Sequence, residues 1–421
     1  MRAAIHHQQP DRVPLDLGSS SVTGVHASAC ARLRRLYGLP EKPVKVVDPF
    51  QMLAEVDHDL REALGVDTVG IQLPYTVFGF KNEHFKPWRL PDGTEVLVPG
   101  GFETRTAPNG DLLLFPRGDR SAPPSGRMPL DGYYFDPIVR QKPLTEENLD
   151  PRLWVEQTFA RYTDEELREL ERASLNARRE TDLAVVGNFC DGGLGDIGLV
   201  PAPGAPDPAG VRDPQEWYIS LLTRKSYVQD IFEYQTELAL ENLGGYLQAC
   251  GERIDVIDVS ETDFGGQQGP LVSPELFREL WAPRLKRIND WIHRNTSWKI
   301  FFHSCGAVAE LLEDFIEAGV DIINPVQYTA RGMDPGALKR RFGNRLVFWG
   351  GGVDSQRVLP FGTEREVERE VAGNLHLLGA GGGYVFAVVH NLQATVPDAN
   401  IRALFDAFHG NRAVWHDQEV R

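Results

Sequence analysis

Three side chains that could bind a metal ion follow predicted strands. His303 and Cys305 lie in the short sequence HSCG, between a run of strand-forming residues and an amphipathic helix. Alternate residues of an extended segment share a face, so this imidazole and this thiol can turn toward the same point. Zinc favours such mixed nitrogen and sulfur ligands, and catalytic zinc sites leave one position open. Two ligands do not hold zinc, so a third must come from elsewhere in the chain.

His390 is the best candidate for that third ligand, because it also closes a predicted strand and precedes a new loop and helix. Glu261 or Asp263, in the sequence SETD, could supply a fourth ligand or position a substrate. Simpler interpretations remain open for each of these residues. A lone buried cysteine often serves as a small hydrophobic residue, a single histidine as a hydrogen-bonded core residue, and SETD as an exposed acidic loop.

Other polar side chains also follow the predicted strands. In a barrel of parallel strands, functional residues gather at the carboxyl ends of the strands. We therefore predict a catalytic group of His303, Cys305, His390 and Asp263. We also predict a group that orients the substrate, made of Asn188, Glu261, Gln268, Asn324, Gln327 and Asp354.

Seven short apolar runs would position these side chains: 66–73, 183–189, 254–260, 298–304, 320–326, 345–353 and 383–391. Nearly all lack polar alternation, as expected of a parallel sheet that is covered on both faces. Helical patterns separate them, such as 273–295, in which Ser273 is a suitable N-cap and Pro274 fits the first turn. The alternation predicts a (β/α)8 TIM barrel with one further strand. A doubly wound sheet is the alternative, but no GxGxxG sequence opens a helix.

Residues 78–136 interrupt this alternation of strands and helices, since they contain many prolines and the turn sequences PDG and PNG. Asp-Gly and Asn-Gly between short β-runs are hairpin signals. We predict a β-hairpin-rich insertion or cap near the barrel mouth, within a single barrel domain over residues 1–421.

The composition excludes several classes of protein. A net charge of −16 argues against a nucleic-acid partner, because such proteins need a basic face. No run approaches the ~18 apolar residues of a membrane span. The four cysteines are widely spaced, which suits free thiols in a reducing compartment. We therefore expect a cytoplasmic enzyme.

Two long segments resemble the uroporphyrinogen decarboxylase superfamily. The first is FFHSCGAVAELLEDFIEAGVDIINPVQ at 301–327, and the second is GGGYVFAVVHNLQATVPDANIRALFDA at 381–407. DRVPLDLG near the start and GPLVSPELFRELWAPRLKRI in the middle fit the same pattern. The resemblance spans Asp11 to Ala407, and it also implies a (β/α)8 barrel.

This superfamily contains two chemistries. One branch decarboxylates uroporphyrinogen without a metal, and the other moves methyl groups between corrinoid proteins and thiols or other acceptors with the help of zinc. The resemblance implies that His303 and Cys305 are zinc ligands, and that His390 replaces a later cysteine. The arginine-bearing N-terminal stretch that grips carboxylates in the decarboxylases is not matched, since the corresponding residues 6–27 contain a single arginine, Arg12.

These patterns favour a zinc-dependent methyltransferase that moves a methyl group between a small substrate, a methyl ether or a thiol, and a corrinoid cofactor on a partner protein. A His/Cys/His set carries one thiolate, which makes the metal more electrophilic and slightly favours the ether. A metal-free decarboxylase of a small or porphyrin-like carboxylic acid is the alternative, with Asp263 or His390 placing a proton. A non-catalytic barrel that binds a corrinoid protein or a small ligand is a third hypothesis.

Overall fold

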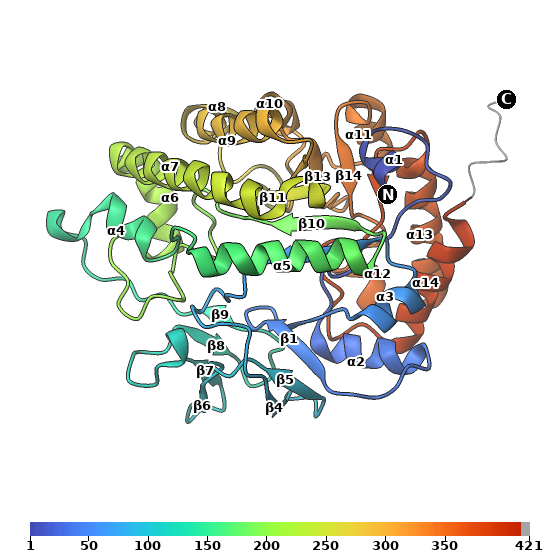
Figure 1. Ribbon diagram of the computed structural model, residues 1–421, viewed down its shortest axis with the longest axis horizontal. Coiled ribbons are helices and arrows are strands. Elements are labelled where there is room, and N and C mark those ends of the chain that lie inside the picture. The colour runs from blue at the N-terminus through green and yellow to red at the C-terminus, as the bar shows by residue number, and fades with distance from the viewer. Residues whose placement is uncertain (414–421) are drawn as a thin grey trace.

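A curled parallel sheet forms the centre of the computed structural model, which describes residues 1–413 (Figure 1). Seven strands pair side by side in the order β15-β14-β13-β12-β11-β10-β3. Each lies within one of the seven apolar runs, which confirms the predicted parallel sheet. The strands are β3 (Thr68–Gln72), β10 (Ala184–Asn188), β11 (Val256–Ser260), β12 (Lys299–His303), β13 (Ile322–Asn324), β14 (Val347–Trp349) and β15 (Tyr384–Val385).

The segment around Leu15 occupies the eighth position and closes the ring between β15 and β3. Leu15 forms a parallel bridge with Phe386, just after β15. On the other side, the Leu15 carbonyl accepts a hydrogen bond of 2.8 Å from the backbone N–H of Asp67, just before β3. The sequence pattern did not reveal this segment because it contains Pro14 and its pairing is an isolated bridge and not a longer run. The predicted (β/α)8 barrel is thereby confirmed.

Helices cover the outside of the sheet (Figure 1). The helical pattern at 273–295 forms two helices, since the first ends at Leu280 and the second begins at Ala282, with Pro283 in its first turn. The Ser273 hydroxyl accepts a hydrogen bond from the N–H of Leu276, as expected of an N-cap. The helices are α1 (Arg2–Ile5), α2 (Ala27–Leu36), α3 (His58–Leu64), α4 (Pro151–Glu156), α5 (Asp164–Glu180), α6 (Pro214–Thr223), α7 (Lys225–Cys250), α8 (Pro274–Leu280), α9 (Ala282–Asn295), α10 (Leu312–Glu317), α11 (Pro335–Phe342), α12 (Val358–Phe361), α13 (Glu364–Gly379) and α14 (Asp398–Asn411).

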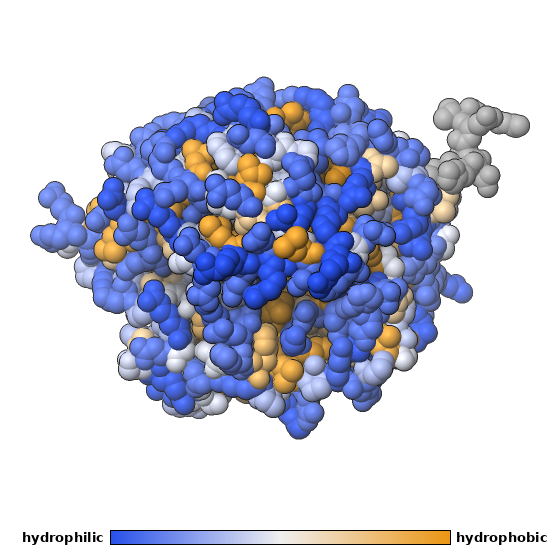
Figure 2. Space-filling model, in the orientation of Figure 1, coloured by the Kyte–Doolittle hydropathy of each residue, from blue (hydrophilic) through white to orange (hydrophobic). Residues whose placement is uncertain are grey.

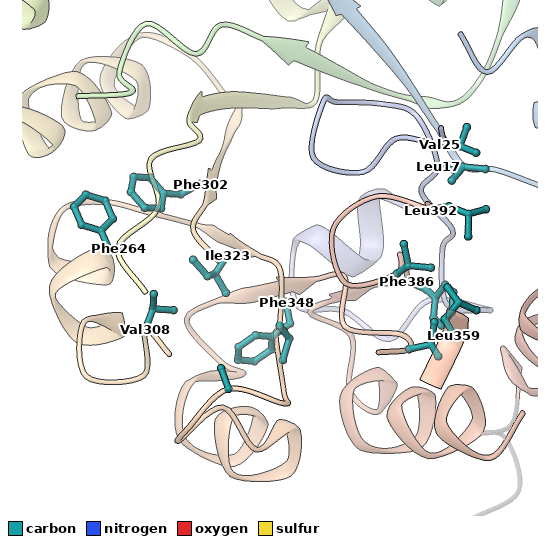
Figure 3. Packing of buried hydrophobic residues seen from close by; sticks show 14 of the residues in the cluster. Leu17, Val25, Phe264, Phe302, Val308, Ile323, Phe348, Leu359, Phe386 and Leu392 are labelled. Carbon is teal, nitrogen blue, oxygen red and sulfur yellow. The ribbon is translucent and has the colours of Figure 1, made fainter. Parts of the chain in front are cut away.

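Successive residues of the barrel strands are buried on opposite faces. Val186, Val256 and Phe301 pack together in the barrel interior, in a cluster that other strands complete. The residues between them face the helices, and Phe302 there packs in one cluster with Phe264 (Figure 3). Both faces are apolar because both are covered, which is why the strands lack polar alternation. The inward positions continue to the carboxyl ends of the strands, where polar residues replace the apolar ones.

Residues 44–137 contain eight further strands in two small sheets, which lie together beside the barrel in Figure 1. Both turn signals form hairpins: PDG joins β4 to β5, and PNG joins β6 to β7. The first sheet has the order β2-β1-β5-β4 and the second β6-β7-β8-β9. Two of these strands, β1 and β2, come from residues before position 78, where the predicted insertion begins. The strands are β1 (Val44–Asp48), β2 (Leu53–Ala54), β4 (Lys86–Arg89), β5 (Glu95–Val98), β6 (Thr104–Thr106), β7 (Leu112–Leu114), β8 (Gly126–Met128) and β9 (Asp136–Pro137).

The face of the molecule in Figure 2 is mainly hydrophilic, and its hydrophobic side chains form small separate groups. Among residues 1–413, no helix has the length and apolar character that a membrane span needs.

Candidate metal centre

His303, Cys305 and His390 meet at the carboxyl ends of the barrel strands. One ligand atom from each lies within 4.8 Å of the other two. Cys305 Sγ is 3.5 Å from His303 Nε2, and the two imidazole rings are 5.3 Å apart between centroids. β12 ends at His303, and its side chain faces the barrel interior, as that of Phe301 does. His390 follows β15, which is separated from β12 by two strands of the sheet. The fold therefore brings together the three residues that the sequence proposes as metal ligands.

A close passage of two loops determines where Cys305 lies. Gly306 has a positive φ of 84°, and a Cβ added there would stand 2.3 Å from the carbonyl oxygen of Gly265. The side chain of Asp263 accepts a hydrogen bond of 2.6 Å from the N–H of Cys305, and Gln327 accepts one of 2.8 Å from the N–H of Gly306. The glycine of HSCG is required because the turn packs directly on another backbone.

The protonation of this group suits a metal. Burial lowers the pKa of His303 to about 4, and burial together with the neighbouring His303 lowers the pKa of His390 to about 4. Both imidazoles are therefore neutral at pH 7 and keep a lone pair for a ligand bond. Burial, and then the carboxylate of Asp263, raise the pKa of the Cys305 thiol, so a nearby cation is needed to keep it as a thiolate. Two neutral imidazoles and one thiol are a donor set that zinc accepts, and the residues fit that metal.

A cavity of about 620 Å³ opens over Cys305 and His390. One wall is aromatic and comes from the β-rich region, through Phe50, Tyr134 and Phe135. Asp136 is the one charged carboxylate of the lining, and no lysine or arginine of the described chain lines this cavity. The remaining lining residues are Gln51, Gly265, Gly266, Gln267, Gly306, Gln327, Ser355, Gln356, Val389 and Gln393.

Two of the other predicted site residues lie at this centre. Asp263 Oδ1 is 3.6 Å from His303 Nε2, which places the carboxylate beside the metal ligands. Gln327 lines the cavity.

Asn324 is fully buried behind His303 and does not reach the cavity. Its Oδ1 lies 2.6 Å from His303 Nδ1, and its Nδ2 donates to the Trp349 carbonyl at 2.9 Å. Asn324 thus contacts His303 from behind and does not line the cavity, whereas it was predicted among the substrate-orienting residues.

Four predicted substrate-orienting residues lie outside this cavity. Gln268 is exposed to solvent, and its neighbour Gln267 lines the cavity instead. Asp354 is buried in a turn, where its side chain accepts a hydrogen bond from the N–H of Gln356. Asn188 and Glu261 face a different part of the barrel interior. These four side chains point away from this cavity because a place after a strand does not fix the direction of a side chain, and their role in substrate binding stays a prediction.

The aromatic wall was not predicted from the sequence. Phe135 is held by a hydrogen bond of 2.9 Å from its N–H to the Phe50 carbonyl, so two segments distant in the chain form one surface. The aromatic sequence YYFD at 133–136 could have indicated a binding surface. A local sequence pattern does not show, however, that these side chains face the barrel.

Comparison with known proteins shows similarity to one family model and to solved structures. Residues 209–411 match the family model described as uroporphyrinogen decarboxylase (URO-D). A solved structure of a methyltransferase from Methanosarcina mazei is similar over 97% of this chain and 96% of that chain, with a TM-score of 0.53 and 18% sequence identity. At this identity the likeness shows a shared fold. No curated protein matches the chain.

Proposed function

Because this chain carries a domain of the uroporphyrinogen decarboxylase family, we propose that it is a zinc-dependent methyltransferase of that superfamily. It would move a methyl group between a small substrate and a corrinoid. The observation that carries the proposal is the donor set of His303, Cys305 and His390, within 4.8 Å of one another and open to a cavity. The name of the structurally similar protein from Methanosarcina mazei supports the same class of reaction.

His303, Cys305 and His390 would hold the zinc. When bound, zinc supplies Lewis acidity, which favours a thiolate acceptor or the departing oxygen of a methyl ether. Asp263 restrains the backbone N–H of Cys305 and keeps the thiol aimed at the imidazoles. The aromatic wall excludes water from the substrate, and Gln327 fixes the turn after Cys305.

The cavity lining argues against the alternative, a decarboxylase of a polycarboxylic acid. Such a substrate needs cations to offset its charge, whereas the described lining contributes one carboxylate, Asp136, and no lysine or arginine. Uncharged or cationic substrates suit this lining, and a neutral methoxyphenol or thiol is the simplest choice.

The remaining features follow from this reaction. We propose that residues 78–136, within a single barrel domain, act as the cap that supplies the aromatic wall. A corrinoid protein would approach the cavity mouth beside it, because a corrinoid must come within reach of the methyl group.

The test combines metal analysis with turnover. We expect zinc in the purified protein, loss of one equivalent in His303→Ala, and methyl transfer from methylcobalamin to 2-mercaptoethanol or from 2-methoxyphenol to cob(I)alamin. The variant His376→Ala, at an exposed position of α13 away from the cavity, serves as the control for folding. Zinc-independent release of CO₂ from a carboxylic acid, without methyl transfer, would show that the proposal is wrong.

A further inference from the structure

A second group of ligand-type side chains lies inside the barrel, apart from the donor set described above. One ligand atom each from Cys190, Asp258 and Glu261 lies within 4.8 Å of the other two. Asp258 is on β11, two residues after the inward-facing Val256, so its side chain also faces the interior. Asn188 is its register partner on β10, and its side chain faces the same way.

The carboxyl group of Asp258 lies beside that of Glu261 and lacks a hydrogen-bond donor among the described residues. Its side chain is 0% exposed, and neither of its oxygens has a hydrogen-bond partner among residues 1–413. The adjacent Asn188 Oδ1 is also buried without a partner in that part of the chain, because the amide N–H groups of Asn188 donate to the carbonyls of Ser19 and Ile71. Buried polar oxygens are normally satisfied, and a buried carboxylate most of all.

Asp16 is a second buried carboxylate of the same barrel, and its hydrogen bonds are all provided by the protein. It is 1% exposed, and it accepts hydrogen bonds from Ser19 Oγ at 2.9 Å, Thr68 Oγ1 at 2.6 Å and Trp349 Nε1 at 2.8 Å. Asp258 has none of these donors, although it is as deeply buried. The difference between the two carboxylates indicates that something outside the chain balances Asp258.

We propose that Cys190, Asp258 and Glu261 form a second metal site, which binds a divalent ion of the zinc class with Asn188 Oδ1 as a further oxygen ligand. One sulfur and several oxygens at this spacing suit zinc or Co²⁺ better than Mg²⁺, which avoids sulfur. This proposal does not depend on methyl transfer, because it concerns residues outside the His/Cys/His set.

A second cavity, with a mixed polar and apolar lining, gives the ion an access route. The cavity has a volume of about 310 Å³, and Ser21, Asn188 and Asp48 are among its lining residues. The Ser21 hydroxyl donates a hydrogen bond to Glu261, so the wall of this cavity touches the proposed site. Ser21 also holds Glu261 in place, as partners of metal-binding carboxylates commonly do.

The experiment is a titration of the metal-free, full-length protein with Co²⁺, because a thiolate bound to Co²⁺ gives a charge-transfer band in the near ultraviolet. We expect two equivalents of Co²⁺ to bind to the wild type and one to Asp258→Asn. In Cys305→Ser, about half of the band should remain, and Cys190→Ser in that background should abolish it.

Cys250→Ser is the matched control, because Cys250 is a buried thiol outside the two ligand clusters of the described residues. It should leave both the stoichiometry and the band unchanged. Circular dichroism shows whether each variant is folded, and Cys190→Ser alone provides the test if Asp258→Asn is not. Binding of one equivalent to the wild type, with complete loss of the band in Cys305→Ser, would overturn the proposal. Asp258 and Glu261 would then be a pair of carboxyl groups that share a proton.

Discussion

The side-chain amide of Asn324 determines which nitrogen of His303 carries a proton. Asn324 Nδ2 donates to the Trp349 carbonyl at 2.9 Å, and this bond turns Oδ1 toward His303 Nδ1, 2.6 Å away. A carbonyl oxygen only accepts, so Nδ1 must be the protonated nitrogen. The lone pair of the neutral ring is then on Nε2, the atom that lies 3.5 Å from Cys305 Sγ.

Removing this amide should weaken metal binding without removing a ligand. We expect Asn324→Ala to lower the zinc affinity by about 10–100-fold, because the tautomer and the ring orientation of His303 are no longer fixed. Competition with a chromophoric chelator measures the dissociation constant. Asn289→Ala is the control, since Asn289 is also fully buried and donates to a carbonyl, that of Ala318, away from the site. Equal losses of affinity in both variants would refute a specific role for Asn324.

His390 should be replaceable by another ligand but not by an inert side chain. We expect His390→Cys to retain zinc, because a thiolate is a competent ligand, and His390→Ala to lose one equivalent during dialysis against a chelator. Metal content after dialysis, determined by mass spectrometry, distinguishes the two. His376→Ala, at an exposed position of α13, should match the wild type. Full zinc retention in His390→Ala would remove His390 from the ligand set.

Gly306 should tolerate no side chain. Its φ of 84° disfavours other residues, and a Cβ there would stand 2.3 Å from the Gly265 carbonyl oxygen. We expect Gly306→Ala to cost at least about 2 kcal/mol of unfolding free energy and to displace Cys305. Urea denaturation measures the loss. Gly373→Ala in α13, where a Cβ meets no atom within 4 Å, should leave stability unchanged or raise it by up to about 1 kcal/mol.

The half-buried carboxyl group of Asp196 should make stability depend on pH. Burial raises its pKa to about 7 in the folded protein, above the value of about 3.9 in an unfolded chain. Such a group contributes stability that is complete below pH 4 and is lost as the pH rises through 7. We expect the unfolding free energy to decrease from pH 4 to pH 8, by about 1.4 kcal/mol for each pKa unit.

Asp196→Asn keeps the shape and the acceptor for the N–H of Gly198 but does not ionise. Urea denaturation at pH 5 and pH 8 should show a smaller difference for this variant than for the wild type. An unchanged difference would assign the pH dependence to other groups.

Much of the barrel was predictable because each strand is a local signal. A parallel strand covered on both faces is apolar at most positions, and seven such runs contain the seven strands. The strand at Leu15 escaped because its bonds to Phe386 and Asp67 are made to residues distant in the chain.

The site was predictable only in part, for a related reason. The spacing of His303 and Cys305 places both side chains at one strand end, and that much depends on local geometry alone. The partnership of Asn324 with His303 depends on the register between β12 and β13, in which these two residues stand opposite each other. The aromatic wall depends on how the β-rich region packs against the barrel.

The sequence by itself therefore determined the strands, the hairpins and the ligand types, since these follow from short-range periodicity and turn chemistry. The tertiary structure alone decided that His390 reaches His303, that Asn324 contacts the His303 ring, and that Asp258 is buried without a donor among the described residues. The physical reason is that ring closure and strand register determine which side chains meet, and both arise from contacts between residues far apart in the chain.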